Sequence, residues 1–171
     1  MNEQVAADVA EVARIGLLFL DGDALEHILR DTVSTDQDDI DYDYDSFNCL
    51  KITLMRIERI RPDLRLFAAL WQFRPDNPGA AAAVVCGSKK CCGVGPILWP
   101  PANAPYWVAQ PAAPELLKAF QSSNAVQRLW SGGASWYFPV KDSDDEITGV
   151  LELRRFDPDS EASAAVWRGI V

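Results

Sequence analysis

The sequence predicts an α+β domain in which several helices pack on a central antiparallel sheet of about five strands. Apolar residues recur at helical spacing up to about residue 61, whereas later stretches are apolar throughout or alternate as in strands. The last three strand-like stretches are separated by short turns, which suit antiparallel neighbours. The chain has 171 residues and shows no internal repeat, so we expect one domain over 1–171.

The first helix is expected within residues 1–20. Its apolar side chains recur at spacings of four and three, which is the pattern of a coiled-coil seam. We therefore interpret it as a dimerisation helix that supports a weak parallel homodimer, because a seam this short is not stable alone. The seam residues are Val5, Val9, Val12, Gly16 and Phe19.

Two further helices follow in this half of the chain. Gly22 is expected to end the first helix, and Asp23 to cap a short second one. The third helix is predicted to begin at Asp45 or Ser46 and to end before Pro62. Its core-facing residues are predicted to be Phe47, Leu50, Leu54 and Ile57.

The remaining elements are mainly strands. Residues 64–73 are apolar on both alternating faces, which predicts a central strand covered on both sides. A paired second strand is expected over residues 80–86, after the turn that follows it, although the alanines of this stretch would also suit a helix. A short helix is expected near residue 115. Three strands then close the sheet, over residues 124–130, 135–141 and 146–155.

The charge pattern argues against two kinds of site. A net charge of −9 does not suit a nucleic-acid partner, which normally requires a basic surface. Residues 31–45 contain seven Asp and no Lys or Arg, which indicates a solvated loop. Asp41, Asp43 and Asp45 alternate as in a calcium loop, but Ser46 and Ile52 replace the required Gly and Glu. A weak divalent-ion site in this loop stays open.

Three stretches resemble a known family once they are taken in chain order. They are "LDGDALEHIL" (residues 20–29), the helix–Pro–strand unit of residues 44–73, and the closing hairpin "GGASWYFPVKDSDDEITGVLEL" (residues 132–153). Together they resemble PAS-like sensor domains, and more narrowly the single Cache domain, the extracytoplasmic sensor of bacterial transmembrane receptors. The family usually has Gly where Asp145 stands.

The resemblance implies a sensor that binds a small molecule or ion, without catalysis and without a cofactor. The pocket is expected between the sheet and the Gly/Pro-rich segment from Cys86 to Pro111. Arg128 and Lys141 are expected to hold a ligand carboxylate. The predicted aromatic lining is Trp71, Phe73, Trp99, Tyr106, Trp107, Trp130, Trp136 and Phe138.

The resemblance also places the domain between two membrane helices, on the periplasmic face of the inner membrane. Residues 157–171 would then be an exit segment toward the second membrane helix, and the signal would leave through the last strand. Such a receptor is a histidine kinase, a cyclase such as a diguanylate cyclase, or a chemoreceptor. An intracellular PAS-like or GAF-like regulatory domain in the cytoplasm is the alternative.

The cysteines fit this compartment. Cys86, Cys91 and Cys92 lie close together, and in an oxidising compartment we expect Cys86 to pair with Cys91 or Cys92. Free thiols or a metal site remain alternatives, whereas Cys49 is expected to be buried in its helix. A cysteine-dependent enzyme is disfavoured, because the single histidine, His27, is not placed to activate a thiol.

Overall fold

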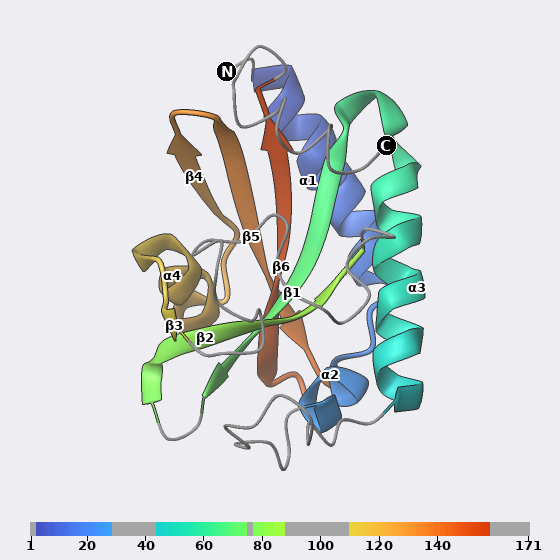
Figure 1. Ribbon diagram of the computed structural model, residues 1–171, viewed down its shortest axis with the longest axis vertical. Helices are drawn as coiled ribbons and strands as arrows, with labels where there is room; N and C mark the ends of the chain where they lie inside the picture. Colours follow the sequence, from blue (N-terminus) through green and yellow to red (C-terminus); the bar gives the residue numbers. More distant parts are fainter. Residues whose placement is uncertain (1–2, 29–43, 75–76, 88–109, 158–171) are drawn as a thin grey trace.

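The computed structural model describes residues 3–28, 44–74, 77–87 and 110–157 (Figure 1). Four α-helices and six strands lie within these ranges, with one short 3-10 turn between α3 and β1. The elements in chain order are α1 (Glu3–Leu17), α2 (Gly22–Ile28), α3 (Tyr44–Ile60), η1 (Pro62–Leu64), β1 (Leu66–Arg74), β2 (Asn77–Cys86), β3 (Gln110–Pro111), α4 (Pro114–Ser122), β4 (Val126–Trp130), β5 (Gly133–Lys141) and β6 (Ile147–Phe156).

The sheet has the order β3-β2-β1-β6-β5-β4, and each pair of neighbours is antiparallel. The first and last long strands, β1 and β6, are therefore neighbours at its centre. This confirms the predicted α+β class with a central antiparallel sheet and several helices. The two-residue β3 was not predicted from the sequence, because its single Gln–Pro pair carries no strand pattern.

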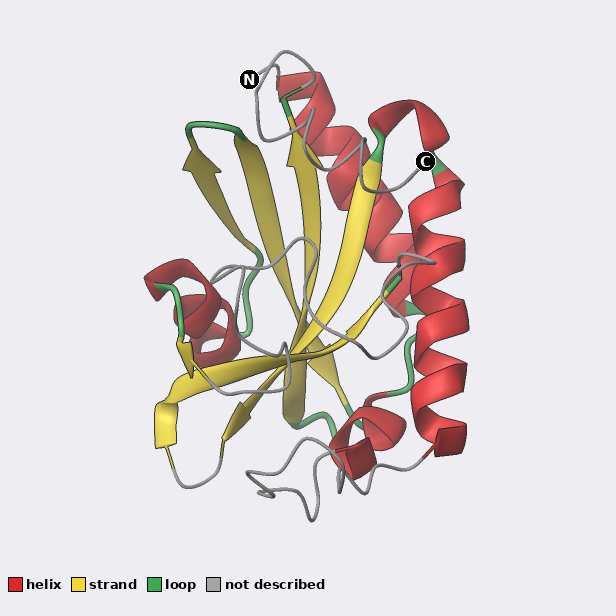
Figure 2. Ribbon diagram, viewed as in Figure 1, coloured by secondary structure: helices red, strands yellow, loops and turns green. Residues whose placement is uncertain are grey.

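The helices divide between the two faces of the sheet (Figure 2). On one face, α1, α2 and α3 enclose a hydrophobic core that we call the helix-side cluster, which includes Leu70 of β1 and Leu151 of β6. On the other face, α4 packs through Leu116 and Ala119 on a second group, the α4-side cluster, which includes Phe67 and Val150. The sheet is thus covered on both faces, as the apolar run of β1 predicts.

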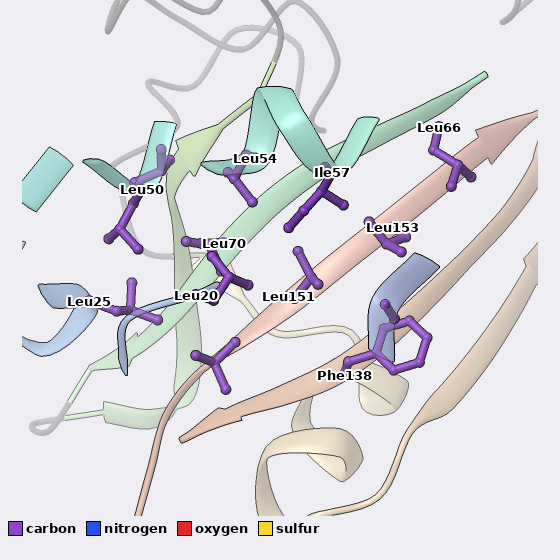
Figure 3. Packing of buried hydrophobic residues seen from close by; sticks show 14 of the residues in the cluster. Leu20, Leu25, Leu50, Leu54, Ile57, Leu66, Leu70, Phe138, Leu151 and Leu153 are labelled. Atoms are coloured by element: carbon purple, nitrogen blue, oxygen red, sulfur yellow. The ribbon is translucent and has the colours of Figure 1, made fainter. Parts of the chain in front are cut away.

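The contact between α3 and the sheet is the centre of the helix-side cluster (Figure 3). Leu50, Leu54 and Ile57 are at most 2% exposed and lie over Leu70 and Leu151. Each fully buried side chain of this size contributes about 1.5–3 kcal/mol relative to an exposed one. The predicted core face of this helix, which also includes Phe47, is confirmed.

The apolar seam of α1 faces the domain itself. Val9 and Val12 are at most 1% exposed, and both belong to the helix-side cluster. A Cβ at Gly16 would lie 2.7 Å from the Cδ1 of Ile57, so glycine allows α1 to approach α3 closely. Val5 packs partly buried on the same cluster, whereas Phe19 is 70% exposed. The part of the seam at Val9 and Val12 therefore packs on the domain, while dimerisation through this helix stays a prediction.

Aspartate side chains form the hydrogen bonds at the start of α2 and at the β5–β6 turn. Asp21, rather than Asp23, caps α2, because its Oδ1 accepts the amide of Ala24 at 3.1 Å. Asp23 Oδ1 instead accepts the amide of Ser143 in the β5–β6 turn, at 3.1 Å. In that turn Asp145 has a φ of 68°, the left-handed conformation for which the resembled family uses Gly.

Candidate functional site

Strand β6 has two charged side chains, Glu152 and Arg154, that are buried on one face of the sheet. Its residues alternate, so Leu151 and Leu153 join the helix-side cluster while Val150 and Phe156 join the α4-side cluster. Glu152 lies on the α4 side by the same alternation, and it is 0% exposed. Arg154, two residues on, is 9% exposed and points to the same side.

A compact set of hydrogen bonds holds the Glu152 carboxylate. Its Oε2 accepts the Trp71 indole Nε1–H at 2.8 Å. Its Oε1 accepts both the Nε and the Nη2 of Arg154, each at 2.9 Å. The Ser135 side chain also hydrogen-bonds this carboxylate. We call these four residues and Tyr137, which lies opposite Glu152 on β5, the charged sheet cluster.

Electrostatics fixes the protonation state of this cluster. Burial acts to raise the pKa of Glu152, but the charge of Arg154 and the hydrogen bonds to the carboxylate outweigh it and keep the pKa below its usual value. Burial, together with the negative charge of Glu152, raises the pKa of Tyr137 to about 12. The cluster therefore holds one carboxylate, one guanidinium and one neutral phenol at neutral pH.

Aromatic rings surround the charged sheet cluster. The Arg154 guanidinium carbon lies 5.9 Å from the ring centroid of Trp130, within the range of a cation–π contact. Phe156 lies edge-to-face with both Phe67 and Trp130, with centroids 5.4 Å apart in each pair. This arrangement excludes water around the ion pair and so strengthens its electrostatic interactions.

Arg128 on β4 supplies a second cation at the margin of this surface. It hydrogen-bonds the Tyr137 side chain, and its Nε lies 3.8 Å from Glu115 Oε2 of α4. The Arg128 side chain is 43% exposed, so it is accessible from solvent. A loose, partly exposed pair of this kind contributes little to stability and can be exchanged for another anion.

The structure divides the predicted aromatic lining between the two faces. Trp71, Phe73 and Trp130 lie together on the α4 side. Trp136 and Phe138 lie on the opposite side, in the helix-side cluster, as Figure 3 shows for Phe138. The prediction that all these rings share one wall is therefore wrong for these two residues. Their neighbour Tyr137 occupies the α4 side instead, since successive strand residues point to opposite faces.

Lys141 is also misplaced by the sequence prediction. Its Nζ lies 2.7 Å from Asp145 Oδ1, in the turn between β5 and β6. This turn lies beside α2, because Ser143 bonds to Asp23 there, and not beside the aromatic rings of the α4 side. Arg154, and not this lysine, is the cation that lies against Trp130.

Several predicted residues lie outside the described residues. They include the predicted pocket-lining residues of the Gly/Pro-rich segment, the acidic loop of residues 31–43, and the exit segment from 158 onward. Cys86 is disulfide-bonded, and its partner lies outside the described ranges. Cys49 is an exposed free thiol, so the expectation that it is buried is wrong. The undescribed site residues are Trp99, Tyr106, Trp107, Cys91 and Cys92.

Sequence reasoning missed Glu152, Arg154 and Tyr137. The available signal was the pair of charges at alternate positions in "VLELRRF", next to Val150, Leu151 and Leu153. The alternation of these charges, matched to the strand period, would have placed them on one interior face.

A separate hollow of about 330 Å³ lies at the β4–β5 hairpin. Its lining includes Leu129, Gly133, Ala134 and Arg155, and among the predicted aromatic residues it includes Trp130. Within the described ranges no group of three or more His, Cys, Asp or Glu side chains is arranged to hold a metal ion. The described part of the chain therefore offers binding groups of the charged and aromatic kind rather than a metal centre.

Comparison of the chain with protein families, with curated proteins and with solved structures gives no match. Among the described residues, no helix is both long enough and apolar enough to cross a membrane.

Proposed function

We propose that this chain is the ligand-sensing domain of a bacterial membrane-bound signal-transduction receptor, of the single Cache, PAS-like kind. In this proposal it lies on the periplasmic face of the inner membrane and binds a small molecule. A change on binding passes to an output domain such as a histidine kinase, a diguanylate cyclase or a chemoreceptor.

The arrangement of the sheet supports this proposal. The five longer strands follow the order β2-β1-β6-β5-β4, with the first and last of them paired at the centre. Three helices cover one face, and the opposite face carries the short helix α4. An antiparallel sheet with helices packed on it is the fold that the resemblance to PAS-like sensor domains implies.

The single observation that carries the proposal is the buried ion pair of Glu152 and Arg154 on the α4 side. A buried ion pair is costly to desolvate, and well-packed apolar residues are often at least as stable in its place. Perturbed, buried charges gather at functional sites. The pair lies among Trp71, Tyr137 and Trp130, and the partly exposed Arg128, which hydrogen-bonds Tyr137, lies at the margin of these rings.

The ligand class that this surface suits is a small carboxylate. Arg128 is accessible, and its guanidinium is held only loosely by Glu115. An incoming carboxylate can replace this partner with a bidentate interaction, which is shorter and stronger.

The test is ligand binding by calorimetry and thermal shift, using a panel of amino acids and other small carboxylates. We expect at least one compound to raise the melting temperature of the unaltered chain, and Arg128→Ala to weaken its binding at least tenfold. Lys141→Ala is the matched control, since it removes a cation that is paired in a distant turn. Equal binding by all three proteins, or no binding by any, would contradict the proposal.

A further inference from the structure

A side chain of α3 accepts a backbone hydrogen bond at the end of the β1–β2 ladder. The Gly87 amide donates to the Ala68 carbonyl at 2.9 Å, as in a regular antiparallel pair. In such a pair the Ala68 amide would bond in return to the Gly87 carbonyl. It donates instead to Glu58 Oε1 of α3, at 2.9 Å. Glu58 thus takes the place of a backbone acceptor where β2 ends.

A second side chain of α3 binds the same end of β2. Lys51 Nζ donates to the Cys86 carbonyl at 3.0 Å, two turns of helix before Glu58. Gly87 allows the close approach, because a Cβ there would lie 2.6 Å from Glu58 Oε1. Cys86 is in addition disulfide-bonded. The end of β2 is therefore joined to α3 by hydrogen bonds from a basic and an acidic side chain of that helix.

The Glu58 carboxyl group is in an unfavourable place for a negative charge. Burial raises its pKa to about 7, although the Ala68 amide and the charges of Lys51 and Arg59 act in the opposite direction. Both of these cations lie on α3 itself. From β1 and the end of β2, Ala68 and Gly87 meet the carboxyl group, and neither has an ionisable side chain.

We propose that the contact of α3 with the end of β2 is a proton-controlled junction, closed more firmly when Glu58 is protonated and loosened when it is charged. A protonated carboxyl group still accepts the Ala68 amide through its carbonyl oxygen, and it avoids the cost of holding a charge in a half-buried position. A charged Glu58 regains its full hydration only when α3 moves away from the strand end.

The direction of the effect follows from linkage. The closed junction binds a proton more tightly than an open one, in which Glu58 titrates near its ordinary value of 4.5. The free energy that favours the closed junction is therefore greatest below about pH 4.5. It falls as the pH rises and is smallest above about pH 7. Through the contact of Ile57 with Gly16, a movement of α3 also reaches α1.

This inference goes beyond the proposed function, and its test needs no ligand. The full chain is labelled with ¹³C, the Glu58 carboxyl carbon is titrated by NMR, and hydrogen exchange of the Ala68 and Gly87 amides is followed. After correction for intrinsic exchange, we expect local opening to increase at least tenfold between pH 5 and pH 8. In Glu58→Gln, a neutral isostere, this dependence should vanish.

Glu146→Gln is the matched control, because Glu146 is an exposed residue of the β5–β6 turn. It should keep the pH dependence of the unaltered chain. A Glu58 titration midpoint near 4.5, or a pH dependence that persists in Glu58→Gln, would overturn the proposal. The titration of the unaltered chain decides the matter even if the glutamine variant does not fold.

Discussion

Trp71 and Glu152 are 81 residues apart in the chain, and a buried 2.8 Å hydrogen bond from the indole Nε1 joins them across the central strand pair. Trp71 lies on β1 and Glu152 on β6, so the bond ties the first long strand to the last. Because Arg154 binds the other carboxylate oxygen, loss of either partner leaves a buried group unsatisfied.

We therefore expect Arg154→Met to destabilise the domain by about 3–5 kcal/mol, because it leaves the Glu152 charge buried without its cation. Urea denaturation followed by tryptophan fluorescence measures this free energy of unfolding. The double variant Glu152→Gln/Arg154→Met should lose less than the sum of the two single variants, since the charge is removed together with its partner. Additive losses would indicate that the two residues do not act as a pair.

Val9→Glu should prevent folding, because Val9 is 0% exposed and an unpaired buried charge costs several kcal/mol. Circular dichroism and solubility report this directly. Ala10→Glu is the control, since the next residue along α1 is exposed. If Val9→Glu folded normally and changed only the oligomeric state in sedimentation, α1 would face a partner and not the core.

Gly16→Ala should destabilise the domain by about 1–3 kcal/mol, because the new methyl group meets the Ile57 side chain. Shortening that side chain makes room, so Gly16→Ala/Ile57→Val should recover part of the loss. Thermal unfolding of the four proteins of this cycle measures the coupling. No recovery in the double variant would mean that backbone strain, and not the Ile57 contact, limits the site.

Glu58→Gln should change stability in a pH-dependent way. Burial raises the Glu58 pKa to about 7 in the folded state, against 4.5 as its ordinary value, so the unaltered chain loses stability as the pH rises between these values. Each unit of pKa difference is worth about 1.4 kcal/mol, which partial exposure reduces. At pH 8 the variant should be more stable than the unaltered chain by about 1–3 kcal/mol, and at pH 4 the two should be similar.

The denaturation midpoints of both proteins across this pH range measure the difference. A constant offset at every pH would show that the amide side chain changes packing rather than removing a titration.

The helices and strands could be predicted because local residues specify them. Pro62 ends α3 in the sequence as in the structure, and the core face of that helix follows from its spacing. Which face a strand residue occupies could not be predicted for β5. Trp136, Tyr137 and Phe138 are three consecutive aromatic residues, so no alternation of polar and apolar residues marks which of them share a face.

The partner of the α1 seam could not be predicted for a related reason. Val9 and Val12 recur at a spacing that serves equally for a helix in a dimer and for a helix on its own core. The charges of Glu152 and Arg154 were not predicted to be buried, because the indole that completes the hydrogen bonds of the carboxylate belongs to Trp71 on β1, 81 residues earlier in the chain.

The ion pair on β6 also has a consequence for how the chain finds its register. A strand that is apolar on both faces can pair one residue out of step at little cost, because either set of side chains is acceptable on either side. In β6 such a slip would turn Glu152 and Arg154 into the helix-side cluster, among Leu54 and Ile57, where two charges would meet an apolar surface. The pair therefore selects one alignment of β6 between β1 and β5 and penalises the misaligned sheet during folding.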